Sequence, residues 1–137
     1  MIARAHPAEM PPRLLLDTHV WLWWQSDDRR LARSARAAIA NAAEAYVSAA
    51  SAWEMVIKTT LGKLRAPTDI EAAVAEGGFR ELPVEFRHIA ALRTLPPHHR
   101  DPFDRLLIAQ AHADRLTLVT ADPALPRYGV PHLWAGR

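Results

Sequence analysis

Short apolar runs alternate along this chain with longer segments of helical periodicity, and the alternation predicts strands separated by helices. The apolar runs of strand length are residues 14–16, 45–48, 79–82, 116–119 and 130–134. The predicted helices are residues 31–43, about 48–61 with Ser48 or Ser51 as cap, 67–76, 84–92 and 101–114, with shorter helical turns around 21–24 and at 122–128. This rhythm predicts an α/β fold with a mostly parallel sheet and helices on both faces.

The composition is that of one ordinary globular domain. The chain has 137 residues, of which half are hydrophobic and 23% are charged, and this length is enough to bury a core. Residues 1–12 are polar and proline-bearing, so we expect an N-terminal extension before a single domain at 13–137. No apolar run approaches the length of a membrane span, and residues 1–12 lack the apolar stretch of a signal peptide. We therefore expect a cytoplasmic protein with no membrane partner.

The charge balance and the lack of cysteine limit the chemistry. Lysine and arginine total 17 and the acids 15, a net charge of +2, and Lys58 and Lys63 are the only lysines. Arginine binds phosphate bidentately, although an arginine-rich solvated surface explains the same composition. There is no cysteine, which excludes disulfides, thiolate metal sites and a cysteine nucleophile.

Two aspartates lie just beyond predicted strands. Asp17 directly follows the strand at 14–16, and Asp122 follows the strand at 116–119 across two residues. Ligands of open parallel sheets bind outside the carboxyl ends of the strands, so both aspartates are candidate site residues. Aspartate is also a common helix N-cap, which is the alternative role for each, and Pro123 strengthens that alternative for Asp122.

Three further acids belong to predicted helices. Glu54 lies on or beside the apolar face of its helix, where burial of a carboxylate is costly unless a partner compensates its charge. An ion pair with Lys58, four residues later, is the purely structural explanation. Asp101 precedes a proline and is typical of an N-cap. Asp104 heads the apolar face that continues with Leu107. Stabilisation of the helix dipole does not require that position, so we favour a functional role for Asp104.

Several carboxylates at strand ends and helix starts predict a divalent-metal site. Carboxylates held close together raise one another's pKa, and a hard cation removes this penalty. Mg²⁺ binds through a few carboxylates and keeps several waters, whereas no HExxH motif and no zinc-like histidine spacing occur, so we expect Mg²⁺ or Mn²⁺. Such an ion activates water for attack on phosphate, and the absence of a GxxxxGK[ST] loop leaves phosphodiester hydrolysis as the expected reaction.

Four separated motifs resemble, in order, those of PIN-domain toxins of the VapC family. They are LLLDTHVWLWW, YVSAASAWEMVIKTTLGKL, HHRDPFDRLLIAQA and LTLVTADPAL with YGVPHLW, and together they cover nearly all of residues 13–134. The resemblance implies a three-layer α/β/α PIN fold with a central parallel sheet. It also implies a metal-dependent endoribonuclease that acts on RNA as the toxin of a type II toxin–antitoxin system.

The same resemblance assigns roles to individual residues. Asp17, Glu54, Asp104 and Asp122 are the expected catalytic and metal-binding acids, and Asp101 is an extra acid of the third motif that is expected to assist the metal. The residues expected to bind phosphate or a metal-bound water are Thr18, Thr120, Arg100, Arg105 and Lys58. The implied partners are a VapB-like antitoxin, which threads a helix or arm along a groove beside the active site, and a second copy of the chain in a homodimer.

The tryptophans carry a separate expectation. Trp53 is expected to lie with Val56 on the inner side of its helix, and both Trp53 and Trp134 are expected to pack in the core. Trp21, Trp23 and Trp24 crowd one short segment and cannot all face inward, so at least one is a candidate interface residue (residues 21–24).

Two other classes of function are compatible with parts of the sequence. Asp17 after a first strand also occurs in aspartyl-phosphate phosphatases and receiver domains. The phosphatase pattern, however, has a second aspartate where this chain has His19, and a receiver has a lysine after a late strand, where none occurs. A non-catalytic RNA- or protein-binding module on the same fold, with the acids serving as caps and ion-pair partners, is the main alternative.

Overall fold

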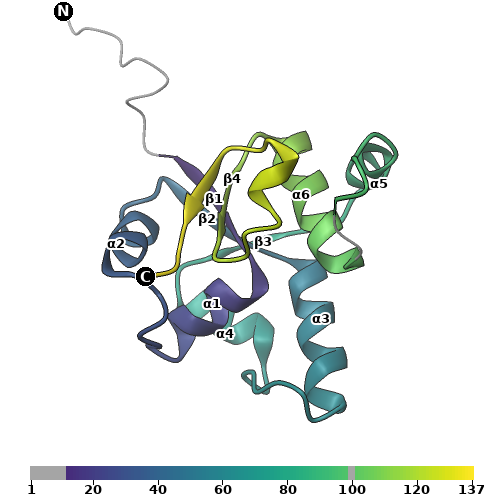
Figure 1. Ribbon diagram of the computed structural model, residues 1–137. Helices are drawn as coiled ribbons and strands as arrows, with labels where there is room; N and C mark the ends of the chain where they lie inside the picture. The colour runs from purple at the N-terminus through teal and green to yellow at the C-terminus, as the bar shows by residue number, and fades with distance from the viewer. Residues whose placement is uncertain (1–11, 99–100) are drawn as a thin grey trace, which may run out of the picture.

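The computed structural model describes residues 12–98 and 101–137, and these form a five-stranded sheet covered by helices (Figure 1). The strand order is β3-β2-β1-β4-β5, and every neighbouring pair is parallel. The strands are β1 Arg13–Leu16, β2 Glu44–Ser48, β3 Arg80–Leu82, β4 Thr117–Thr120 and β5 His132–Trp134. The predicted α/β fold with three layers and a parallel sheet is therefore confirmed. The predicted extension at 1–12 lies, apart from Pro12, outside the described residues.

The helices follow the predicted order, and their bounds are shorter than predicted except for α1, which is longer than the turn expected around 21–24. They are α1 Thr18–Gln25, α2 Arg33–Ala40, α3 Ala49–Thr60, α4 Ile70–Glu76, α5 Phe86–Leu92, α6 Pro102–Asp114 and the 3₁₀ helix η2 Pro126–Tyr128. The predicted start of α4 at residue 67 is wrong, because Asp69 caps the helix and accepts the N–H of Ala72 at 3.0 Å. The predicted helical turn at 122–128 is also too long, since only its last three residues are helical.

Capping residues fix the two helices that carry acids toward the candidate site. Ser48 caps α3, its Oγ accepting the N–H of Ala50 at 3.0 Å. Asp101 caps α6, with Pro102 in the first turn. Arg115 ends α6 in the left-handed conformation, with φ of 55°. These caps set where each helix begins beside the sheet, and hence how its first turns face the carboxyl ends of the strands.

The sheet is buried between two apolar cores. Leu14 and Leu16 face one core, which they share with α1, α2 and parts of α3 and α4, whereas Leu15 faces the other core, against α6. Side chains alternate between the two faces of a strand, so a fully apolar run such as β1 belongs at the centre of a sheet covered on both sides. Within the described residues, no helix is both long enough and apolar enough to cross a membrane.

The predicted inner face of α3 is wrong. Trp53 is 61% exposed and Val56 is 53% exposed, and Trp134, also predicted to be in the core, is 44% exposed. The buried side of α3 instead consists of Ala50, Ser51, Glu54 and Met55, of which only Met55 is a large apolar side chain, and α3 contacts α1 and α6. Of the crowded tryptophans, Trp21 is fully buried and the other two are partly exposed, as the expectation that they cannot all face inward requires (residues 21–24).

Candidate active site

The candidate site lies at the topological switch point of the sheet, where the strand order changes direction between β1 and β4. β1 is followed in the sheet by β2 on one side and by β4 on the other, so a crevice opens between the segments that leave β1 and β4. Asp17 directly follows β1, and Asp122 lies two residues beyond the end of β4. Helices α3 and α6, which carry further acids, lie next to each other beside the sheet (Figure 1). This position agrees with the rule that directed attention to the strand ends.

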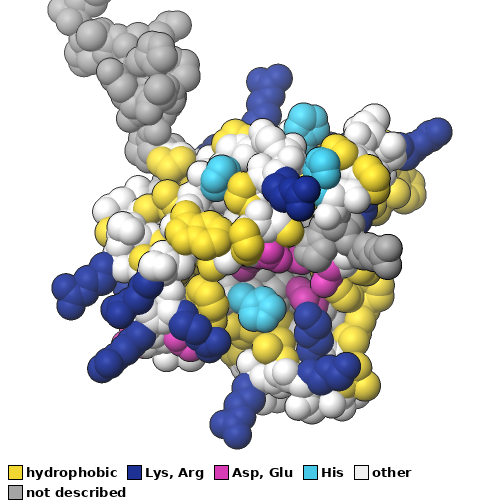
Figure 2. Space-filling view, viewed as in Figure 1, with side chains coloured by type: hydrophobic (Ala, Val, Ile, Leu, Met, Phe, Trp, Pro, Cys, Tyr) yellow, Lys and Arg dark blue, Asp and Glu magenta, His cyan; other side chains and the backbone are white. Residues whose placement is uncertain are grey.

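All five acids predicted from the sequence line one cavity of about 460 Å³ at this point. Figure 2 shows acidic side chains at the bottom of a hollow near the middle of the face, with Lys and Arg side chains along the rim below it. The residues that line the cavity are Asp17, His19, Trp23, Glu54, Lys58, Asp101, Asp104, Ala121, Asp122 and Pro123. His19 and Trp23 had not been predicted as site residues, although both belong to the first of the four motifs.

Asp17 is buried and held in a fixed orientation. Its Oδ1 accepts the N–H of Val20 at 2.9 Å, which is the N-cap bond of α1, and its Oδ2 accepts the hydroxyl of Thr120 at 2.6 Å. Burial raises the pKa of Asp17, and the bonds from Thr120 and Val20 act in the opposite direction. The N-cap role proposed as the alternative is therefore real, and it leaves Asp17 on the wall of the cavity.

Thr120 connects the two acids that follow strands. Besides donating its hydroxyl to Asp17, it accepts the backbone N–H of Asp122 at 3.0 Å. Asp122 in turn accepts the N–H of Ala124 at 2.9 Å, which forms a local turn in place of the predicted helix start. One fully buried hydroxyl therefore fixes the carboxylate of Asp17 and the backbone that presents Asp122.

Glu54 is also buried, and both of its oxygens have partners. Thr18 donates to Oε1 at 2.6 Å, and Lys58 Nζ lies 2.6 Å from Oε2. The predicted ion pair with Lys58 is confirmed, yet Glu54 is only 2% exposed, so the pair forms at the wall of the cavity and not on the outer surface. The hydrogen bond to Glu54 raises the pKa of Lys58, and the charges of Asp101 and Asp104 act in the same direction.

The two acids of α6 enter the cavity from the start of the helix. Asp101 Oδ1 accepts the N–H of Phe103 at 2.8 Å and that of Asp104 at 3.1 Å, so the N-cap role predicted for it is confirmed. Asp104 lies in the first turn and lines the cavity, while Leu107, nearly one turn later, is fully buried. The apolar face of α6 is therefore headed by a carboxylate that faces the site.

The donor set fits a hard cation held through few protein ligands. The residues given in the structure contain no compact group of three or more His, Cys, Asp or Glu side chains around one point. Five carboxylates nevertheless line the cavity, together with Lys58 and His19. Mg²⁺ binds through one or two carboxylates and retains several waters, so it fits such an open acidic wall, whereas a structural zinc site needs a closed cage of ligands.

The other predicted substrate contacts lie in different places. Thr18 and Thr120 are buried against the carboxylates of Glu54 and Asp17, so in this structure they hold acids in place. Arg105 is not among the lining residues; its guanidinium donates to the backbone oxygen of Pro96 at 2.9 Å. Arg100 lies outside the described residues.

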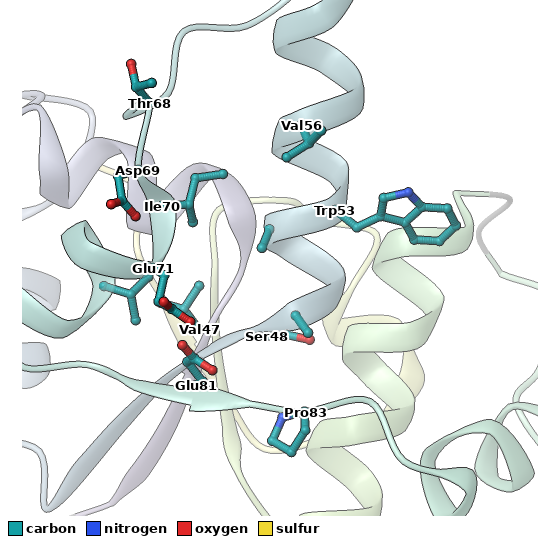
Figure 3. Close-up of a pocket in the computed structure, with 13 residues that line it drawn as sticks. Val47, Ser48, Trp53, Val56, Thr68, Asp69, Ile70, Glu71, Glu81 and Pro83 are labelled. Carbon is teal, nitrogen blue, oxygen red and sulfur yellow. The ribbon is translucent and has the colours of Figure 1, made fainter.

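A second, larger hollow lies between α3, α4 and the edge strand β3, and other residues of α3 line the acidic cavity. It has a volume of about 710 Å³ and is lined by apolar side chains that include Val56 and Ile70. Figure 3 shows Ile70 of α4 pointing toward α3, with Glu71 and Glu81 close together at the sheet end of the hollow. The exposed Trp53 borders it and packs edge-on against Phe103 of α6, with 5.2 Å between the ring centroids. We refer to this hollow as the α3/α4 groove.

The fold and the cavity define an α/β protein with an acidic site at the carboxyl ends of its parallel strands. A family model described as the PIN domain matches residues 14–131, and the chain therefore belongs to the PIN domain family. PIN domains are generally nucleases. A comparison with curated proteins found no match.

Solved structures with the same fold include three protein complexes. VapBC from Salmonella typhimurium bound to DNA has a TM-score of 0.65 at 15% identity, covering 89% of this chain and 97% of that chain. VapBC2 from Rickettsia felis bound to a promoter DNA fragment has a TM-score of 0.64 at 12% identity, covering 90% of this chain and 98% of that chain. FitAcB from Neisseria gonorrhoeae has a TM-score of 0.63 at 18% identity, covering 88% of this chain and 96% of that chain. At these identities the likeness establishes the fold.

Proposed function

We propose that this protein is a Mg²⁺-dependent endoribonuclease that acts as the toxin of a VapBC-type toxin–antitoxin pair. The observation that carries the nuclease proposal is the single cavity at the switch point of the sheet, where carboxylates from β1, α3, α6 and the segment after β4 converge. Membership of the PIN domain family supports the same reaction class. We place the activity in the cytoplasm, where RNA is available.

The carboxylates of Asp17 and Asp104 are the ones we assign to the principal Mg²⁺, for which Mn²⁺ is a substitute, with Asp122 and Asp101 completing the acidic wall. When bound, the ion lowers the pKa of water and stabilises charge on the scissile phosphate and on the leaving oxygen. Asp17 is suited to this role because Thr120 and the first turn of α1 hold its carboxylate in one orientation (2.6 Å and 2.9 Å).

Glu54 and Lys58 are the side chains of the cavity that we assign to the attacking water and to the substrate. Glu54, held by Thr18 and Lys58, orients the attacking water. Lys58 is 32% exposed at the cavity, so it can also contact a phosphate oxygen of the substrate. Water attacks the phosphorus in line, the bond to the 3′-oxygen breaks, and the products carry a 5′-phosphate and a 3′-hydroxyl.

Cleavage of RNA by purified protein tests this proposal. Asp17→Asn and Asp104→Asn should each lower the rate of cleavage in Mg²⁺ by at least about a hundredfold, the scale of losses at electrostatic catalytic groups. Asp27→Asn is the matched control, because Asp27 is 92% exposed and pairs with Arg36 away from the cavity. Full activity of either cavity variant would refute the assignment, and sequencing of the cleaved ends identifies the RNA.

The main competing function is a non-catalytic binding module in which the acids are only caps and ion-pair partners. The observed caps at Asp17 and Asp101 agree with that reading as well, so metal binding must decide. If the nuclease proposal is right, Mg²⁺ or Mn²⁺ raises the melting temperature of the wild type and the rise is lost in Asp104→Asn. A metal-independent melting temperature together with RNA binding but no cleavage would favour the module.

The proposed protein partner is an antitoxin of the VapB type. The solved complexes named above are supporting observations, since proteins of this fold occur in them together with a partner. The α3/α4 groove is the surface we assign to the antitoxin, because it is apolar inside and α3 lines both it and the acidic cavity. Among the described residues, its lining includes Asp69, Glu71 and Glu81 and no basic side chain, so the fitting segment is apolar with basic flanks.

Co-purification with the product of a neighbouring reading frame tests the antitoxin assignment. Ile70→Asp in the groove should abolish co-purification and leave RNA cleavage intact, whereas Phe86→Asp on α5, where Phe86 is 93% exposed, should not affect co-purification. A homodimer is also proposed, as the sequence implied. If Ile70→Asp instead converts a dimer of the lone chain to a monomer, as measured by size-exclusion chromatography with light scattering, the groove is the dimer contact.

A further inference from the structure

Lys58 is an internal cation of the acidic cavity. Its ammonium lies 2.6 Å from Glu54 Oε2, and the aliphatic part of the side chain places it where Asp101 and Asp104 also act on it electrostatically. The partner carboxylate is 3% exposed while the lysine is 32% exposed, so the ammonium lies between the buried acid and the open cavity. A positive charge at this position affects any other cation that enters.

The other oxygen of Glu54 has a partner as well. Thr18 Oγ1 lies 2.6 Å from Glu54 Oε1 and 2.9 Å from Ser51 Oγ. Thr18 has one hydroxyl proton, and an ionised carboxylate can only accept, so Thr18 donates to Glu54 and Ser51 donates to Thr18. Glu54 is thus satisfied by a neutral donor on one side and a cation on the other, without any metal.

We propose that Lys58 is the resident counter-ion of Glu54 and takes the place in the cavity that a second divalent cation would occupy. This deepens the nuclease proposal and rests on it for the principal ion at Asp17 and Asp104. Glu54 then serves as a positioning group for water and not as a metal ligand. A divalent ion on the open side of Glu54 would have to approach the ammonium, and the repulsion between two cations in a partly desolvated site is strong. Removal of the ammonium leaves a buried carboxylate without its counter-charge, which is the condition that recruits a cation.

The number of Mn²⁺ ions bound per chain, measured by electron paramagnetic resonance of the free ion, tests this proposal. Lys58→Met keeps much of the side-chain volume and removes the charge, and it should bind one ion more than the wild type. Lys63→Met is the matched control, because Lys63 is the only other lysine and lies exposed in the turn after α3, and it should bind the wild-type number. The double variant Lys58→Met/Glu54→Gln should return to the wild-type number, since the uncompensated carboxylate is gone.

Glu54→Gln alone supplies a second test that does not depend on the stability of Lys58→Met. The proposal predicts an unchanged number of bound Mn²⁺ ions in Glu54→Gln, whereas a Glu54 that is a metal ligand predicts the loss of one ion. The proposal is overturned if Lys58→Met binds no additional ion, or if Glu54→Gln loses one. If Lys58→Met does not fold, Glu54→Gln decides.

The nuclease proposal and this proposal fail in different ways. A wild type that binds Mn²⁺ and cleaves RNA, with no additional ion in Lys58→Met, keeps the nuclease and removes the role of Lys58. A wild type that binds no Mn²⁺, with one ion in Lys58→Met, supports the role of Lys58 and removes the metal-dependent nuclease.

Discussion

Replacement of Thr120 by valine perturbs the most connected hydroxyl of the site. Thr120 is fully buried, donates to Asp17 Oδ2 at 2.6 Å and accepts the N–H of Asp122 at 3.0 Å. Valine has nearly the same shape, so Thr120→Val removes these bonds without opening a cavity. A hydrogen bond to an ionised group contributes about 1.5–3 kcal/mol and one between neutral groups about 0.5–1.5 kcal/mol. We expect Thr120→Val to lower the free energy of unfolding by about 2–4.5 kcal/mol while Asp17 is ionised.

The loss of stability caused by Thr120→Val should depend on pH in a defined direction. Burial raises the pKa of Asp17, so its ionisation opposes folding, and stability that is present at low pH is lost as the pH rises through the pKa of the folded state. The bond from Thr120 lowers that pKa, so Thr120→Val raises it further. Below the pKa both hydrogen bonds join neutral groups, and the cost of Thr120→Val should fall to about 1–3 kcal/mol.

Urea denaturation in a metal chelator at several pH values measures this effect. Thr117→Val, on the same strand but outside the cavity, is the control for the loss of a threonine hydroxyl. The reasoning also predicts coupling, because Thr120→Val should cost about 1–2 kcal/mol less in an Asp17→Asn background than in the wild type. A loss below about 0.5 kcal/mol, or an equal loss at low and high pH, would refute the account of how Asp17 is held.

Three further predictions concern the frame around the site. Arg115→Gly should raise the free energy of unfolding by about 0.5–1 kcal/mol in thermal denaturation, because Arg115 has φ of 55°, and an unchanged or lower stability contradicts this. Ser48→Ala should cost about 1–3 kcal/mol, because it removes both the α3 cap and the buried hydrogen bond that Ser48 donates to Gln110; a cost below about 0.5 kcal/mol would argue against both roles. Arg87 and His88 lower the pKa of Asp114, so the pair stabilises the fold at pH above the ordinary aspartate pKa and loses this effect as the pH falls through the lowered value. Asp114→Asn should therefore cost up to about 1 kcal/mol at pH 7 and little at the acid end, and a cost that is constant with pH would contradict the pairing.

The sequence predicts the sheet well because apolar runs in parallel strands are nearly continuous. Residues 14–16 are apolar on both faces, which is the signature of a central strand, and they form β1. The acids at 17 and 122 could be placed near each other because strand ends of a parallel sheet share one edge. Asp104 could be added because it heads the buried face of α6.

The face of α3 could not be predicted for a physical reason. The pattern placed Trp53 and Val56 inward, since large apolar side chains normally mark the buried side of a helix. The structure buries Ser51 and Glu54 instead, because Thr18 and Lys58 supply their hydrogen bonds from another helix and from the next turn. A periodicity argument has no knowledge of such partners, so helices that line polar sites are where it fails.

The central claim is that Asp17 and Asp104 share one divalent ion in the cavity. Anomalous X-ray scattering from crystals of the active protein grown with Mn²⁺ locates the ion directly. The account predicts a peak bonded to the carboxylates of both residues, and its loss in Asp104→Asn crystals. A protein that cleaves RNA only with Mn²⁺ or Mg²⁺, yet shows its peak away from both aspartates, would contradict it.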